Sequence, residues 1–257
     1  MIDIHCHALP GVDDGAASME VALEMLAGAR AEGTTAVVLT PHVQPADGPE
    51  RDCLHREAYV ELRRAAAQAG LELDLHLGAE VAFRFGLADV AKWPSVGLAG
   101  TRFVLVDLAP GPLSPGLEQG FFELRSSGRR PILAHPERQR QLARQPERLE
   151  RLRQQEVLVQ VDAASFTGRF GRRARAAAEM LLQRGWVDYV ASDGHDLAKR
   201  PMGLAAVQRQ LTALAGEGEA RRLLADNPQR LLRGEEPQAG AATAQPRGWR
   251  RLLARNK

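Results

Sequence analysis

The chain opens with MIDIHCHALPGVDDGA, residues 1–16. Met1–His5 is typical of a short strand, and a loop rich in glycine and aspartate follows it. His5 and His7 stand two positions apart where this strand ends. Because alternate residues of an extended strand point to the same side, both imidazoles can reach one metal ion. The segment therefore predicts a strand whose carboxyl end carries a pair of metal ligands.

Short apolar runs alternate with helical patterns along the rest of the chain. The expected strands are Met1–His5, Ala36–Thr40, Leu73–Glu80, Phe103–Asp107, Pro131–Ala134, Val157–Val161 and Val187–Ala191. The expected helices are Ser18–Glu32, Glu50–Ala69, Ser114–Ser126, Glu137–Gln155, Arg172–Arg184 and two more between Met202 and Leu224. Runs of Val, Ile and Leu are typical of parallel strands that are buried on both faces. The pattern fits a closed α/β barrel or an open doubly wound sheet.

Further residues of the metal-ligand types follow the expected strands at their ends: His42, Glu80, Asp107, His135, Asp193 and His195. The carboxyl ends of parallel strands converge on one face of an α/β fold, where sites are built. Imidazoles mixed with carboxylates suit Mn, Fe, Zn or Co rather than Ca. More ligands than one ion needs imply several ions, which is typical of phosphate ester hydrolysis.

The composition excludes several other classes of protein. The 257 residues are 44% hydrophobic and 26% charged, which is ordinary for a folded globular chain. No apolar run of about 18 residues is present, so no membrane-spanning helix is expected. The first residues lack the order of a secretory signal. Two cysteines, Cys6 and Cys53, are too few for a disulfide framework, which favours the cytoplasm.

The net charge of +2 is unevenly distributed. Residues 237–257 hold five basic residues and no acid, and removing those five charges leaves residues 1–236 at −3. The basic character therefore belongs to a tail, which we expect to be disordered, and it does not indicate nucleic-acid binding. A second interpretation is weak contact of this tail with anionic lipid at a membrane surface.

The motifs MIDIHCHALPGVDDGA, TPH, GAE, AHPER and SDGHDLAKRP together resemble the PHP (polymerase and histidinol phosphatase) superfamily. Within it they are most similar to the bacterial protein-tyrosine phosphatases encoded with capsular or exopolysaccharide genes. The resemblance extends from Met1 to about Leu232. It implies a distorted (β/α)7 barrel of parallel strands, similar to a TIM barrel, over residues 1–236.

The resemblance also implies three divalent metal ions, with Mn2+ as the first expectation and Fe, Zn, Co or Mg as alternatives. The ligands that it implies are His5, His7 and Asp193 for the first ion, Asp14 and His42 for the second with Glu80 as the bridge, and His135, His195 and Asp107 for the third. This branch usually has Glu at the position of Asp107. Because Asp is one methylene shorter, we expect the third site to be shifted or weaker.

Two arginines match family residues that contact the phosphoryl group, Arg138 in HPER and Arg200 in KRP. A guanidinium suits phosphate because it binds two oxygens at once and neutralises charge. Asp13 is an outer partner of the ligands, a general acid, or a residue that shapes the loop Gly11–Gly15. Asp3 either orients a ligand histidine or is structural. Neither cysteine is followed by arginine at the sixth position, so a thiolate mechanism is not expected, and Cys6 is expected in the core.

The resemblance implies a phosphoric monoester hydrolase, a protein-tyrosine phosphatase in the cytoplasm. Its substrate would be phosphotyrosine in the C-terminal segment of a bacterial tyrosine kinase that controls capsule or exopolysaccharide synthesis. Two alternatives stay open from the residues themselves. One is a small-molecule phosphatase, such as histidinol phosphate phosphatase. The other is a non-catalytic metal-binding PHP module.

Overall fold

The computed structural model describes residues 1–108 and 111–242. Its strands form two parallel sheets. The first sheet has the order β1 (Ile2–Cys6), β2 (Ala36–Leu39) and β4 (Asp74–Leu77). The second has the order β3 (His42–Val43), β5 (Glu80–Ala82), β6 (Phe103–Asp107), β7 (Arg130–Ala134), β8 (Leu158–Asp162) and β9 (Tyr189–Ala191). The predicted α/β class with parallel strands is confirmed.

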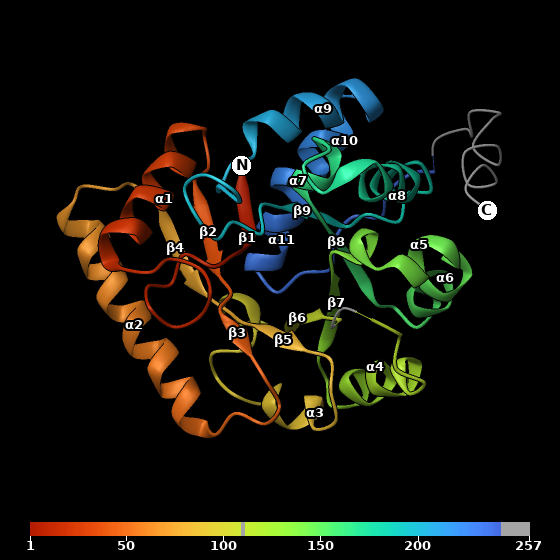
Figure 1. The fold of residues 1–257 in the computed structure, drawn as a ribbon, viewed down its shortest axis with the longest axis horizontal. Coiled ribbons are helices and arrows are strands. Elements are labelled where there is room, and N and C mark those ends of the chain that lie inside the picture. The colour runs from red at the N-terminus through yellow and green to blue at the C-terminus, as the bar shows by residue number, and fades with distance from the viewer. Residues whose placement is uncertain (109–110, 243–257) are drawn as a thin grey trace.

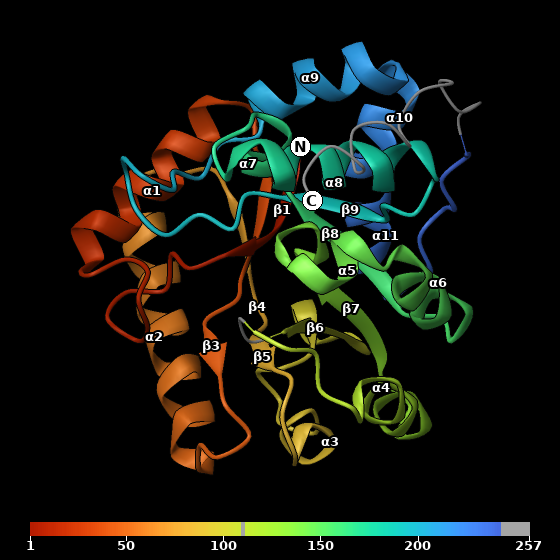
Figure 2. The same cartoon turned by 45° about the vertical axis from the view of Figure 1, so that its right-hand side comes forward.

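Helices surround the strands, which occupy the centre of the molecule (Figures 1 and 2). The α-helices are α1 (Met19–Ala31), α2 (Pro49–Gln68), α3 (Leu87–Val90), α4 (Leu117–Ser126), α5 (Arg140–Arg144), α6 (Pro146–Gln154), α7 (Ala163–Phe166), α8 (Gly171–Gln183), α9 (Ala205–Ala215), α10 (Glu217–Arg221) and α11 (Asn227–Leu232). Short helical turns of other types cover Leu98–Gly100, Pro136–Arg138 and Arg222–Asp226. No helix in the described part of the chain is long and apolar enough to span a membrane.

Alternate strand residues face different layers of the core. One cluster takes its members from strands of both sheets and consists of Ile2, Ile4, Ala36, Val38, Leu98, Phe103, Leu105, Ile132, Ala134, Leu158, Tyr189, Ala191 and Leu231. The intervening residues, such as Val37, Val104 and Val190, belong to clusters that also contain helix residues. Because side chains alternate along a strand, the two sheets enclose one apolar centre and present a second apolar face to the helices.

Backbone hydrogen bonds connect the two sheets on two sides. At one side the His7 N–H donates to the carbonyl of Gly194 (2.8 Å), and the Asp193 N–H donates to the carbonyl of His5 (2.9 Å). At the other side the Glu80 N–H of β5 donates to the carbonyl of Pro41, which lies between β2 and β3 (3.1 Å). The first connection brings the ends of β1 and β9 together, and with them the residues predicted to hold the first ion.

Three predicted elements differ from those observed. The strand expected at Leu73–Glu80 is divided into β4 and β5 at Gly78, where a Cβ would lie only 2.6 Å from Leu98 Cδ2. The helix expected at Glu137–Gln155 is broken before Pro146, which has no N–H to donate and begins α6. The last predicted helices end too early, because a π-turn and α11 continue to Leu232.

The predicted tail begins inside the described residues. Gln238 lies against the helices, since its carbonyl accepts from Arg222 Nη1 (2.8 Å) and its N–H donates to Asn227 Oδ1 (2.8 Å). The segment 237–242 therefore contacts the rest of the domain. The remaining part, 243–257, holds all five basic residues and lies outside the described residues, as does its predicted membrane contact.

His55 on α2 gives a testable dependence of stability on pH. Its ring is fully buried, and neither nitrogen has a hydrogen-bond partner among the described residues. Burial, followed by the nearby Arg51, lowers the pKa of His55 from 6.5 to about 4. The unfolded chain therefore takes up this proton first, so the free energy of unfolding falls as the pH drops from 6.5 towards 4.

We expect His55 to account for about 2–3 kcal/mol of the fall in the free energy of unfolding between these pH values, and His55→Leu should lack this part of the fall. Urea unfolding at several pH values between those limits measures the slope for the variant and the wild type. The half-buried His76, which pairs with Asp74, provides the control His76→Gln, which should keep the wild-type slope. An unchanged slope in His55→Leu would contradict the assignment.

Candidate metal centre

The predicted ligands converge where the strands end, and Glu80 lies at their centre. Its carboxylate is 1% exposed. Glu80 Oε2 lies 3.5 Å from His5 Nε2, 3.3 Å from His7 Nε2 and 3.1 Å from His42 Nδ1, and Oε1 lies 2.8 Å from His135 Nε2. The carboxylate that was predicted to bridge two ions therefore touches four imidazoles.

His5, His7 and Asp193 form one group of potential ligands, as predicted for the first ion. The two Nε2 atoms lie 3.2 Å apart, and Asp193 Oδ1 lies 3.4 and 3.5 Å from them. The Nδ1 of His7 donates to Asp13 Oδ2 (2.7 Å), and the Nδ1 of His5 donates to Gln160 Oε1 (3.1 Å). With Nδ1 protonated, both Nε2 atoms present lone pairs to the same point as the carboxylates. This donor set fits a divalent cation.

A second group combines Asp14, His42 and His195 with His7. Asp14 Oδ1 lies 3.2 Å from His42 Nε2 and 3.5 Å from His195 Nε2. The Nδ1 of His195 donates to the carbonyl of Asp193 (3.0 Å), which leaves its Nε2 free to bind a metal. This group is the most open part of the site, because the Asp14 side chain is 67% exposed.

A third group consists of His5, Glu80 and His135. Of the residues predicted for the third ion, His135 lies in this group, whereas His195 lies with Asp14 and His42 in the second. Asp107 lies outside the three groups, with Oδ1 3.7 Å from His135 Nδ1. The strand register explains this distance, because Asp107 is paired with Ala82, two residues beyond Glu80. A Glu at this position would extend one methylene further towards His135. The position of Asp107 therefore agrees with the expectation of a shifted or weaker third site.

Two of the predicted ligands have a left-handed backbone. His135 has φ 32° and Asp193 has φ 51°, and each follows a strand of the second sheet. Non-glycine residues are disfavoured there, and such strain persists only where the surrounding structure imposes it. At Asp193 the backbone hydrogen bond to His5 holds this conformation, and both turns direct the side chain into the site.

Electrostatics within the cluster favour added positive charge. Burial alone would raise the pKa of the Glu80 carboxyl, but His5 and the other imidazoles outweigh burial and hold its pKa well below the usual range. Burial lowers the pKa of His7, but Asp13, Asp193 and Glu80 outweigh it and raise that pKa well above its usual value. The carboxylates thus attract a cation, and a bound metal ion would displace protons from the histidines.

The contacts of Asp13 and Asp3 show what each side chain does. Asp13 contacts a candidate ligand and also shapes the loop, because Oδ2 accepts from His7 Nδ1 while Oδ1 accepts from the Gly15 N–H (2.9 Å). Asp3 Oδ1 accepts from the N–H groups of His5 and Ser192, so it connects β1 to the residues after β9 and contacts no imidazole. Asp3 is therefore structural. Cys6 is fully buried, as expected.

The two predicted arginines lie at the edge of the ligand cluster. Arg138 Nη1 lies 2.8 Å from Asp193 Oδ2 and 3.1 Å from Asp162 Oδ2, and Arg200 Nη2 also contacts Asp193 Oδ2. Phe170 supports both, since the guanidinium carbons of Arg138 and Arg200 lie 4.5 and 6.0 Å from its ring centroid. A cation over an aromatic face is stabilised by the ring quadrupole, so Phe170 orients this pair.

The residues that orient the first group were not predicted from the sequence. Gln160 holds His5, and Asp162 fixes the Gln160 amide by accepting from Nε2 (3.1 Å) while also contacting Arg138. The available signal was the strand LVQVD (Leu158–Asp162), where two polar residues alternate with buried valines and so point to one side. Phe170 had no comparable signal, because it precedes a helix that is distant in sequence from both arginines.

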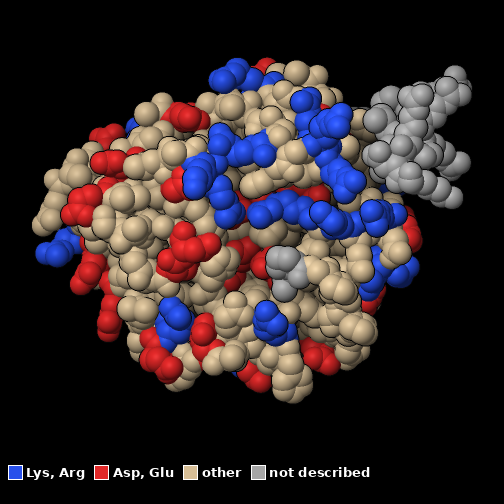
Figure 3. Space-filling view, viewed as in Figure 1, with Lys and Arg blue, Asp and Glu red and all other residues tan. Residues whose placement is uncertain are grey.

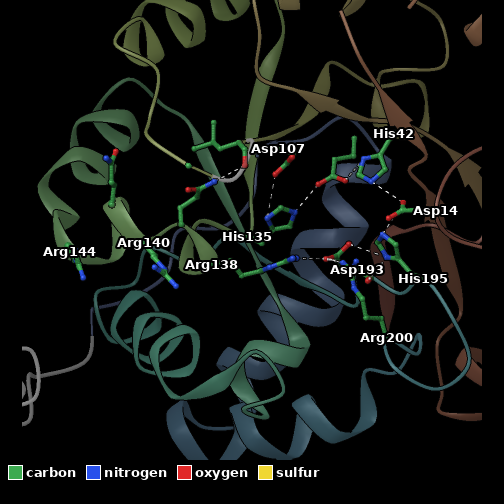
Figure 4. Close-up of a pocket in the computed structure, with 15 residues that line it drawn as sticks. Asp14, His42, Asp107, His135, Arg138, Arg140, Arg144, Asp193, His195 and Arg200 are labelled. Atoms are coloured by element: carbon green, nitrogen blue, oxygen red, sulfur yellow. Dashed lines mark hydrogen bonds and ion pairs between the residues drawn. The ribbon is translucent and has the colours of Figure 1, made fainter. Parts of the chain in front are cut away.

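A cleft of about 520 Å³ is lined by Glu80, Asp107, both predicted arginines and most of the other candidate ligands. Figure 4 shows Asp14, His42, His135, Asp193 and His195 on one side of it, with Arg140 and Arg144 on the other. In the space-filling view, Lys and Arg side chains gather along the edge of a hollow that contains acidic side chains (Figure 3). The cleft therefore combines a metal-binding floor with a basic edge.

The fold and the ligand groups define a metal-binding α/β protein with a site at the carboxyl ends of its strands. The chain belongs to the family described as Capsular polysaccharide synthesis, CpsB/CapC, whose model matches residues 1–233. Tyrosine-protein phosphatase YwqE of Bacillus subtilis (strain 168) is 30% identical over 238 residues, which cover 91% of this chain and 92% of that protein. Tyrosine-protein phosphatase CpsB of Streptococcus pneumoniae is 26% identical, over 90% of this chain and 98% of that protein.

A solved structure is similar over nearly the whole chain. It comes from the crystal structures of YwqE from Bacillus subtilis and CpsB from Streptococcus pneumoniae, described as unique metal-dependent tyrosine phosphatases. The TM-score is 0.87 at 27% identity, and the match covers 96% of this chain and 100% of that chain. The phosphotriesterase from Mycobacterium tuberculosis, at a TM-score of 0.52 and 15% identity, is similar in fold alone.

The contact between Asp13 and His7 predicts an effect on metal affinity. We expect Asp13→Asn to weaken Mn2+ binding about 10- to 100-fold, because it removes the charge that orients His7 and raises its basicity. Titration calorimetry on metal-free protein measures this affinity. Asp89→Asn is the control, since Asp89 is an exposed partner of Lys92 on α3. Equal affinities in the two variants would show that Asp13 only shapes the loop.

Proposed function

We propose that this protein is a metal-dependent protein-tyrosine phosphatase, a phosphoric monoester hydrolase of capsule or exopolysaccharide synthesis. The observation that carries the proposal is the set of three overlapping ligand groups around Glu80, with Arg138 and Arg200 beside them. Clustered divalent sites with adjacent guanidinium groups suit phosphate ester hydrolysis. The relatives named tyrosine-protein phosphatases support phosphotyrosine as the substrate.

The ligand set proposed for the three ions is His5, His7, Asp14, His42, Glu80, Asp107, His135, Asp193 and His195, with Asp107 acting from the edge of the group around His135. Divalent ions held there, of which Mn2+ is our first choice, supply Lewis acidity that lowers the pKa of water and neutralises phosphate charge. Hydrogen bonds from Nδ1 of His5, His7 and His195 orient these imidazoles so that Nε2 would be the atom that binds a metal ion.

The arginines bind the phosphoryl group. Arg138 and Arg200 each donate to Asp193 Oδ2 through one guanidinium nitrogen, which leaves other N–H groups for a ligand. The Arg200 Nε–H is buried and has no acceptor among the described residues. A phosphoryl oxygen would satisfy this donor, and the added positive charge would stabilise the charge that develops during hydrolysis.

The proposed partner is the phosphotyrosine-containing C-terminal segment of a bacterial tyrosine kinase, and the proposed compartment is the cytoplasm. The family's link to capsular polysaccharide synthesis supports such a partner. Both cysteines are free in the structure, which agrees with a reducing compartment.

We also infer that the two sheets form one distorted (β/α)7 barrel within a domain of residues 1–236. Counting β2 with β3, and β4 with β5, as single bent strands gives the seven predicted strands. The shared apolar centre and the hydrogen bonds between β1 and β9 support this arrangement.

Assays on two substrates test the proposed function. With Mn2+, the purified protein should hydrolyse a phosphotyrosine peptide, and EDTA should abolish the reaction. Turnover of histidinol phosphate that is faster by orders of magnitude would favour a small-molecule phosphatase instead. Bound metal without hydrolysis of either substrate would favour a non-catalytic module.

Substitution of single ligands tests the centre itself. We expect His42→Ala and Asp193→Ala each to lower kcat on a phosphotyrosine peptide at least about 100-fold, because each removes a ligand from a different group. Circular dichroism should show that both variants stay folded. Near-normal activity in either variant would contradict its role as a ligand.

Phe170 is expected to act by positioning. We predict that Phe170→Leu lowers kcat/KM about threefold to tenfold, because both arginines lose the aromatic face that orients them. Phe170→Tyr should restore the activity, since it keeps that face. A merely structural role would instead lower thermal stability and leave the kinetic constants of the folded enzyme unchanged.

A further inference from the structure

Two arginines of the cleft have no role in the site described so far. Arg140 and Arg144 are the first and last residues of α5, and residues four apart lie on the same side of a helix. Both are exposed, and both line the cleft that contains Glu80 and His135. In Figure 4 they extend from α5 on the side of the cleft away from His42.

Unlike their neighbours, these arginines have no ion-pair partner in the described part of the chain. Arg148 and Arg151 on α6 face Glu118, and Arg153 pairs with Asp188. Across residues 1–108 and 111–242, no carboxylate forms an ion pair with Arg140 or Arg144. Two positive charges therefore face the cleft without an internal partner.

The segment that carries them is held firmly beside the metal centre. Leu142, between the two arginines, is 2% exposed in the core. The Leu113 N–H donates to Gln141 Oε1 (2.8 Å), and Gln139 Nε2 donates to the carbonyl of Leu108 (2.6 Å). Because α5 follows His135 by only a few residues, its backbone places both arginines beside the candidate ligands.

We propose that Arg140 and Arg144 bind a second anionic group of the substrate, on a residue next to the phosphotyrosine. The proposal rests on the phosphatase function proposed above. Glu80, His135, Arg140 and Arg144 line the same cleft, so a residue next to a phosphotyrosine bound over Glu80 and His135 can reach the arginines of α5. A guanidinium binds carboxylate and phosphate alike, so the group is either an acidic side chain or a second phosphotyrosine.

Three peptides that differ only beside the phosphotyrosine test this site. One has neutral neighbours, one has glutamates, and one has a second phosphotyrosine. We expect kcat/KM of the wild type to be about threefold to tenfold higher for at least one charged peptide, mainly through KM. The double variant Arg140→Gln/Arg144→Gln should reduce this ratio to about one. Rising salt should reduce the wild-type ratio in the same way.

The ratio of kcat/KM between a charged and the neutral peptide separates binding from a structural effect. A variant with a damaged fold has a lower kcat/KM for all three peptides equally. The matched control is Arg63→Gln/Arg64→Gln on α2, which removes the same charge outside the cleft and should keep the wild-type ratio. Preference for the glutamate peptide identifies a carboxylate site, and preference for the doubly phosphorylated peptide identifies a phosphate site.

The same peptides with a non-hydrolysable phosphonate in place of the phosphate allow binding to be measured without turnover. Fluorescence anisotropy should show that the double variant loses the tighter binding of the charged peptides. Equal binding of neutral and charged peptides by the wild type, or an unchanged preference in the double variant, would overturn the proposal. Absence of hydrolysis of every phosphotyrosine peptide would instead count against the proposed function, and the binding comparison would still decide the role of the arginines.

Discussion

The carboxylate of Glu80, buried among four imidazoles, is the constraint on which the site depends. An uncompensated buried carboxylate costs several kcal/mol, so the fold must surround it with positive charge. His5 and His7, whose Nδ1 hydrogens are bound by Gln160 and Asp13, do not provide that charge while they are neutral. The arrangement is therefore balanced when cations occupy the points where these lone pairs and carboxylates meet.

Strand register decides which ligands meet at those points. His42 is paired with Glu80 across β3 and β5, so the two side chains are neighbours. Asp107 is two residues further along β6 and stays at the edge of the site. His5 and Asp193 meet because β1 and β9 are joined through backbone hydrogen bonds. The strained backbone of His135 and Asp193 shows that the surrounding strands impose these positions.

The charges of the cleft are arranged in layers that suit a phosphorylated substrate. Carboxylates of the candidate ligands form the floor of the cleft. Arg138 and Arg200 donate to Asp193, and Phe170 packs against them. Further arginines on α5 form the edge. The negative charge of residues 1–236 is thus concentrated in part where metal ions would neutralise it. Membership of the CpsB/CapC family agrees with chemistry on phosphate esters, and the layered charges supply the physical basis for it.

The sequence by itself predicted where a site would form: the nine candidate ligands and both arginines each follow a strand or belong to a motif, and strand ends meet in any parallel α/β fold. Which candidate ligands lie close enough to share an ion was decided by the tertiary structure. His135 joined Glu80 and His195 joined Asp14, because register and strand order, which no local pattern specifies, set those distances. The same holds for Gln160, Asp162 and Phe170, whose contacts connect segments far apart in the chain.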